Sequence, residues 1–328
     1  MSGSAEAGED TRPVPFGPLG ERARIWHPLI ILIGSFFAFY VWAILPSVVL
    51  ASMDAAAGKT DLMAPDSLLV QYGLPALAVS FGLILLHFLF WTKVVERRPL
   101  TSIGLFRGGS AGKYVNGLVY GALFALLVNL IAVVASLHFG FSMPAMYTGD
   151  TPILRPDLLF FVAMIIPAVL LQGGTEEVVF RGWMLSALSA RTSITLAVLV
   201  SGLAFGLFHV DRFVLDPVFA AIFISSTVVM GAFLGVWAVK AGSILGPMGF
   251  HGAYNALLFV SGFLDQAAKA KPGQPPTQIW SQMMSVENMQ EAIRNLDFVA
   301  AMQTGVIICS LVAIAVMLMS GREEEEEH

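Results

Sequence analysis

Long apolar runs separated by short polar connections dominate the pattern of residues along the chain. A helix that crosses the hydrocarbon core of a bilayer needs about 20 consecutive apolar residues at about 1.5 Å per residue. Eight runs approach or exceed this length, and we expect each to be a spanning helix; the fourth could continue to residue 189. The runs cover residues 27–50, 67–91, 114–138, 157–180, 193–210, 217–239, 243–264 and 298–320.

The composition agrees with this pattern. Of 328 residues, 56% are hydrophobic and only 12% are charged, with a mean hydropathy of +0.76. These values exclude an ordinary soluble globule. The predicted fold class is therefore all-α, a polytopic membrane protein of about eight transmembrane helices whose first partner is the lipid bilayer. A net charge of −5 without a basic block indicates no nucleic-acid partner, and Cys309 alone cannot form an internal disulfide.

Basic residues predict the orientation. They concentrate in the connection between the second and third runs, as Lys93, Arg97, Arg98, Arg107 and Lys113. The positive-inside rule places this connection in the cytoplasm and, with eight spans, both termini there too. The acidic N-terminus lacks the basic start of a signal peptide, so we expect the first run to be retained. An Ala/Gly/Val-rich composition without organelle-targeting features favours a bacterial inner membrane.

Two adjacent carboxylates, Glu176 and Glu177, lie deep in the fourth run. A charge in hydrocarbon costs at least about 2.5 kcal/mol, so such residues suggest a function and need partners. Arg181 follows Glu177 by one helical turn and can pair with it. Glu176 points about 100° away around the helix and needs a different partner.

Two glycines, Gly173 and Gly174, come directly before the acids. We expect them to loosen the helix, and a break there would admit water and let Thr175 cap a restarted helix. Irregular backbone at this depth is tolerated where it lines a cavity or is buried in protein.

Polar residues of two later runs are candidates to meet the acids. His209 ends the fifth run, and His251 and Asn255 share one helix face in the seventh. A carboxylate with a histidine can deprotonate water, and a second histidine with an asparagine can stabilise an oxyanion. Glu176, His209, His251 and Asn255 could together hydrolyse an amide or ester bond inside the membrane.

Three motifs occur in order, E-E-x-x-x-R, F-x-x-x-H and H-x-x-x-N. They resemble those of the CPBP family of intramembrane CAAX-protease-like and bacteriocin-processing enzymes, also called the Abi family. The resemblance covers about residues 157–262. It implies that Glu176 and His209 activate water and that His251 and Asn255 stabilise the oxyanion. It also implies supporting roles for Glu177, Arg181 and Phe205.

Metal dependence stays open at this point. Glu176, His209 and His251 could supply a three-ligand zinc site. However, the sequence has no H-E-x-x-H helix, and the same residues suffice for a metal-free, glutamate-dependent mechanism. We favour the metal-free mechanism and expect no cofactor.

The predicted function is an intramembrane endopeptidase acting on a peptide or a membrane-associated protein, with the oligomeric state open. The alternatives are a proton- or ion-coupled transporter, for which we see no paired repeats, and a non-catalytic membrane scaffold. Five segments are expected. They are a cytoplasmic tail (1–26), N-terminal transmembrane helices (27–140), a catalytic core (157–264), a connection with an interfacial helix (265–297), and a last helix with an acidic tail (298–328).

Overall fold

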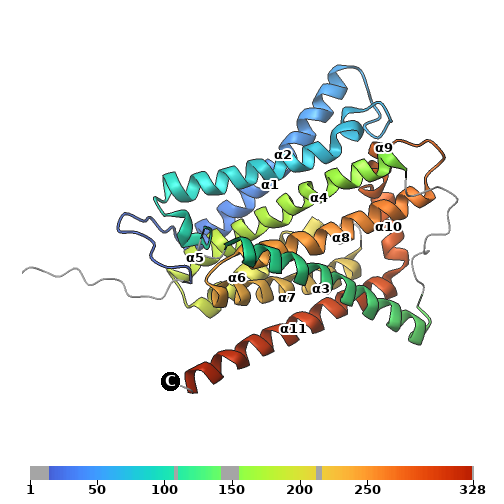
Figure 1. The fold of residues 1–328 in the computed structure, drawn as a ribbon. Helices are drawn as coiled ribbons and strands as arrows, with labels where there is room; N and C mark the ends of the chain where they lie inside the picture. The colour runs from blue at the N-terminus through green and yellow to red at the C-terminus, as the bar shows by residue number, and fades with distance from the viewer. Residues whose placement is uncertain (1–14, 107–109, 142–154, 212–215, 327–328) are drawn as a thin grey trace, which may run out of the picture.

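The computed structural model describes residues 15–106, 110–141, 155–211 and 216–326, and their regular secondary structure is entirely helical. Each of the eight predicted spans coincides with a helix, which confirms the all-α fold class (Figure 1). These helices are α1 (Pro28–Ala56), α2 (Leu68–Phe90), α3 (Ser110–Phe139), α4 (Pro156–Glu177), α6 (Ile194–Leu207), α7 (Pro217–Ala241), α8 (Leu245–Lys269) and α11 (Leu296–Glu326). The shorter elements are η1 (Trp91–Val95), η2 (Leu100–Ile103), η3 (Val178–Met184), α5 (Leu185–Ser189), α9 (Pro276–Met283) and α10 (Val286–Arg294).

The long helices make this an integral membrane protein. Among the described residues, six helical segments are long and apolar enough to cross a bilayer. Helix α6 is apolar but has only 14 residues. Helix α8 has the length of a span but is less apolar, because it carries His251, Asn255 and a polar C-terminal end.

Helices α4 and α8 lie side by side in the middle of the molecule (Figure 1). The α1–α2 pair covers one flank, with α2 against α4. On the other flank, α3 lies against α8, and α11 packs on α3 and α7. The two helices that carry the acids and His251 are therefore enclosed by the rest of the bundle.

Glycines allow α8 to approach its neighbours closely. A Cβ atom on Gly249 would collide with the carbonyl oxygen of Tyr114 in α3, and one on Gly121 would collide with that of Phe250. On the α4 side, a Cβ on Gly173 would lie 2.9 Å from the Cα of Gly252. Small residues let transmembrane helices pack backbone to backbone, which fixes the position of α8 between α3 and α4.

The expected break at Gly173 and Gly174 is wrong. Helix α4 continues through both glycines to Glu177, and the irregular segment, the π-helix η3, begins only after the acids. Gly173 is needed for the contact with α8, not for a break. Thr175 donates its hydroxyl to the Phe81 carbonyl of α2 at 3.3 Å and does not cap a helix.

The 265–297 connection forms two short helices at one end of the bundle, α9 and α10 (Figure 1). Helix α9 buries Ile279, Trp280 and Met283 in a cluster with residues of α2, α4 and α8. Gly73 of α2 makes room for the Trp280 ring, whose nearest atoms would lie 3.5 Å from a Cβ there. The apolar face of α9 is thus covered by protein rather than by lipid.

A buried ion pair holds the connection that follows α2. Arg98 Nη1 lies 3.1 Å from Glu96 Oε2, and both side chains are fully buried. Arg98 Nη2 also donates to the Ser186 hydroxyl of α5 at 2.6 Å. This contact ties the end of the α4–η3–α5 segment to the connection, and it removes Arg98 from the exposed charges on which the orientation was predicted.

We predict that Gly249→Ala destabilises the protein by about 1–3 kcal/mol, because the added methyl group meets backbone atoms that cannot move independently. Thermal unfolding in detergent would measure this effect. Gly82→Ala is the matched control, since no atom lies within 4 Å of a Cβ placed there. Replacing this helical glycine should leave stability unchanged or raise it by up to about 1 kcal/mol. Equal unfolding temperatures for the two variants would contradict the close packing.

Candidate active site

Glu177 joins α8 to the segment that carries the acids. Its Oε1 accepts hydrogen bonds from Arg181 Nη1 at 2.8 Å and from His251 Nδ1 at 2.8 Å. Glu177 and Arg181 have no exposed side-chain surface, and His251 is 5% exposed. The predicted pair of Glu177 and Arg181 is confirmed, and His251 is the second donor to the same oxygen.

These contacts orient the His251 imidazole. The Arg181 guanidinium can only donate hydrogen bonds, so Glu177 Oε1 is the acceptor in their contact. His251 Nδ1 faces the same oxygen and donates to it in the tautomer that carries a proton on Nδ1. Its other nitrogen, Nε2, is the one that faces the neighbouring acid, Glu176.

Glu176 has two partners, one from its own helix and one from α8. His251 Nε2 lies 3.5 Å from Glu176 Oε2, which is longer than an ordinary hydrogen bond. Gln172 Nε2 donates to Glu176 Oε1 at 3.2 Å. Glu176 was predicted to need a partner other than Arg181, and the structure provides two. One of them, Gln172, was not predicted. Its position one turn before Glu176 is the signal that could have found it.

Phe205 of α6 contacts the Arg181 guanidinium and both imidazole rings. The Arg181 guanidinium carbon is 4.2 Å from the centre of the Phe205 ring, within cation–π range. The same ring meets His251 edge to face at 5.5 Å between centroids. On the far side of the guanidinium, a Cβ on Gly231 of α7 would lie 3.2 Å from Arg181 Nη2, so glycine leaves room for the cation.

His209 follows the C-terminal end of α6 and is half-buried. Its Nδ1 is 3.0 Å from the Phe205 carbonyl, and its ring lies 5.5 Å from both the Phe205 and the Phe223 rings. Its partner in motif order, His251, is the histidine that the structure places 3.5 Å from Glu176. Within the described ranges, no three His, Cys, Asp or Glu side chains are grouped to hold a metal ion.

Asn255 lies one turn after His251 on α8, as predicted from the spacing. It is half-buried, and its side-chain amide makes no hydrogen bond to another described residue. An amide beside an imidazole on one helix face can present two donors to the same point.

The π-helix η3 begins directly after Glu177 and carries Arg181. A π-helical turn inside an α-helix is rare and frequent at functional sites, because it redirects the side chains that follow it. Here the residues from Thr175 to Ser189 are all buried, so this segment runs through the centre of the bundle.

Residues 158–257 match a protein family described as type II CAAX prenyl endopeptidase Rce1-like. The matched range covers less than half of the chain and contains all three sequence motifs. No curated protein and no solved structure matches the chain.

This match confirms the CAAX-protease-like resemblance for the segment that contains the acids, Phe205 and His251. A membrane-embedded segment of this family supports the class of protease, a hydrolase of peptide bonds. Within that class, residues 158–257 form an Rce1-like segment.

We predict that Arg181→Met lowers the free energy of unfolding by about 3–5 kcal/mol, because it leaves a buried carboxylate without its cation. Denaturant unfolding in mixed micelles would measure the change. The double variant Arg181→Met/Glu177→Gln should recover a large part of the loss, since it removes the unpaired charge. Additive losses in the double variant would show that the two side chains do not interact.

Proposed function

We propose that this protein is an intramembrane endopeptidase of the CPBP type that hydrolyses a peptide bond in a peptide or membrane-associated protein. One observation carries this proposal. His251 of α8 contacts both buried acids, Glu177 at 2.8 Å and Glu176 at 3.5 Å, inside the segment that matches a protease family. A purely structural ion pair would need only Glu177 and Arg181.

The proposed reaction uses Glu176 as general base. Its carboxylate takes a proton from a water molecule, whose oxygen attacks the carbonyl carbon of the scissile peptide. His251, held by Glu177 through Nδ1, presents Nε2 toward the same place. When Nε2 carries a proton, it can donate to the oxyanion of the tetrahedral intermediate. The proton on Glu176 then passes to the leaving amine as the carbon–nitrogen bond breaks.

Asn255 and His209 are assigned to the surroundings of the reacting carbonyl. The free amide of Asn255 supports its proposed role as the second oxyanion donor. His209 keeps the proposed role of assisting water activation, and its contact with Phe205 places it beside a ring that also meets His251. Glu177, Arg181 and Phe205 hold His251 and the acids in place.

We propose a metal-free mechanism. Each reaction step above uses only protein groups and water, which supports this proposal. We also propose that the protein lies in a bacterial inner membrane with the 92–113 connection and both termini in the cytoplasm. The basic residues of that connection support this orientation, although buried Arg98 no longer contributes to it.

We predict that Glu176→Gln lowers kcat at least about 10²–10⁴-fold, because the amide cannot accept the proton of the attacking water. The assay is cleavage of a peptide pool by purified protein in nanodiscs, followed by mass spectrometry, with and without a strong chelator. Wild-type cleavage should survive the chelator. Glu21→Gln, an exposed carboxylate outside the spans, is the control and should retain full activity. Cleavage by Glu176→Gln at the wild-type rate would refute the mechanism, and loss to the chelator with recovery on added zinc would establish a metalloprotease.

We predict that Gln172→Leu lowers kcat about tenfold and changes KM little, because a lost hydrogen bond of about 1.4 kcal/mol leaves Glu176 misoriented without removing it. Steady-state kinetics on the same peptides would separate the two constants. Gln172→Asn keeps the side-chain amide but shortens the side chain. An equal loss of kcat in this variant would show that the length of the side chain matters as well as its amide. An unchanged kcat in Gln172→Leu would show that this hydrogen bond does not position Glu176.

A further inference from the structure

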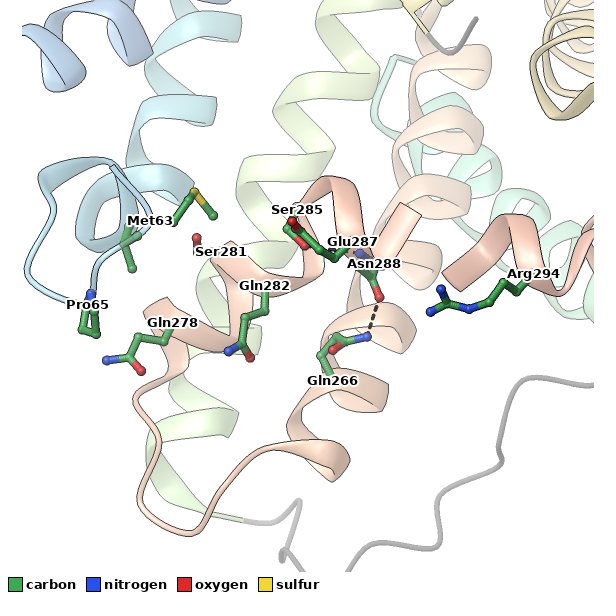
Figure 2. Close-up of a pocket in the computed structure, with 11 residues that line it drawn as sticks. Met63, Pro65, Gln266, Gln278, Ser281, Gln282, Ser285, Glu287, Asn288 and Arg294 are labelled. Carbon is green, nitrogen blue, oxygen red and sulfur yellow. Dashed lines mark hydrogen bonds between the residues drawn. The ribbon is translucent and has the colours of Figure 1, made fainter. Parts of the chain in front are cut away.

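A polar cavity of about 670 Å³ lies at the end of the bundle where α8 finishes, a size typical of ligand sites (Figure 2). Its walls come from the α1–α2 connection, the start of α2, the end of α8, and helices α9 and α10. Gln266 in its wall follows His251 by about four turns of α8, or about 22 Å along the axis. The cavity is therefore separate from the active site, although one helix reaches both.

One wall is a polar stripe along α9 and the turn after it. Its members follow the helical spacing that places side chains on one face. They are Gln278, Ser281, Gln282 and Ser285. The opposite face of α9 is anchored by buried Trp280 and Met283, so the stripe cannot rotate away from the cavity.

The facing polar wall is held by its own hydrogen bonds. Gln266 Nε2 donates to Asn288 Oδ1 at 2.5 Å, the dashed contact in Figure 2, and Asn288 Nδ2 donates to the Met283 carbonyl at 2.8 Å. In the polar stripe, by contrast, the side chains of Gln278 and Ser281 make no hydrogen bond to other described residues. The cavity thus combines fixed polar groups with unused donors and acceptors.

The lining chemistry selects among ligand classes. Among the lining residues that the structure describes, the charged ones are Glu287 and Arg294, of opposite sign, so an anionic headgroup would meet little net positive charge. The same described residues include no aromatic ring for a sugar to stack on. Side-chain amides both donate and accept hydrogen bonds, which matches the pattern of a peptide backbone.

The third wall is apolar. Met63 and Pro65 of the α1–α2 connection, labelled in Figure 2, and Val70 of α2 supply this apolar part of the lining. In an extended peptide, successive side chains point to opposite sides. One apolar side chain of such a peptide would fit against this wall while its backbone faces the amides.

We propose that this cavity binds an extended, uncharged peptide segment and acts as a second substrate-binding site, remote from the scissile bond. Binding of a peptide to this cavity does not require catalysis. The role of the cavity as a substrate-binding site rests on the proposed protease function. The separation of about 22 Å corresponds to about seven extended residues at about 3.3 Å each. Substrates that extend beyond the scissile bond by more than this length gain contacts here, and shorter ones do not.

The first test measures binding without cleavage. The Glu176→Gln protein in nanodiscs is titrated with a fluorescein-labelled pool of neutral heptapeptides made of Ser, Asn, Gln, Val and Leu, and anisotropy is recorded. We expect saturable binding that weakens at least about tenfold in each of two cavity variants. Ser281→Trp fills the cavity, and Gln278→Ala/Gln282→Ala removes two amides that would make about one to two hydrogen bonds to the peptide. Gln290→Trp, an exposed amide of α10 that does not line the cavity, is the matched control.

The same titration contains the outcomes that overturn the proposal. Binding unchanged by both cavity variants, or no saturable binding of the neutral pool, would refute a peptide site. Equal affinity for all-acidic or all-basic pools would refute the selection for uncharged segments, and competition by phospholipid vesicles alone would assign the cavity to lipid headgroups.

The second test adds cleavage to separate this proposal from the proposed function. Peptides cleaved by the wild type are compared as short forms and as forms extended by twelve neutral residues on either side. We expect a higher kcat/KM for one extended form, by about tenfold, and loss of this gain in Ser281→Trp with short-peptide cleavage unchanged. A gain that persists in Ser281→Trp would overturn the second site while leaving the protease intact. Absence of any Glu176-dependent cleavage would instead refute the proposed function, and the binding result would still stand.

Discussion

The structure depends on one buried carboxylate that serves two donors. Glu177 cannot be buried alone in a membrane protein, because an uncompensated charge there is costly. Arg181 neutralises it from the next helical turn, and His251 reaches it from α8. Glu177 therefore holds His251 through Nδ1 with Nε2 toward Glu176, so a contact that stabilises the fold also orients the imidazole.

Close helix packing makes that contact possible. His251 can reach Glu177 only because α8 lies against α4 at Gly173 and Gly252. Likewise, Gly231 gives the Arg181 guanidinium its space beside the Phe205 ring. Because glycine has no side chain, the helices approach closely at these crossings. Polar groups on different helices then come within hydrogen-bond distance.

Most of the fold could be predicted because the thickness of a bilayer imposes a length on every apolar run. The pair of Glu177 and Arg181 followed from local helical spacing. Contacts between helices, such as the one between Glu176 and His251, could not be derived in this way, since spacing along one helix says nothing about the depth of another. Gln172 was missed although it lies one turn before Glu176 on the same helix. The break expected at Gly173 was wrong because glycine permits close approach as readily as it loosens a helix. Arg98 was counted as an exposed charge because its partner, Glu96, lies two residues before it, a spacing that does not suggest a buried pair.

The same glycine contacts close two seams of the helix bundle. Backbone touches backbone where α8 crosses α3 and α4, so no extended chain can pass through either seam. Helix α6 has 14 residues and spans about 21 Å, short of a hydrocarbon core of about 30 Å. A transmembrane helix of this length is accommodated by a thinner bilayer or by polar residues that reach the interface near its end, and His209 follows the end of α6.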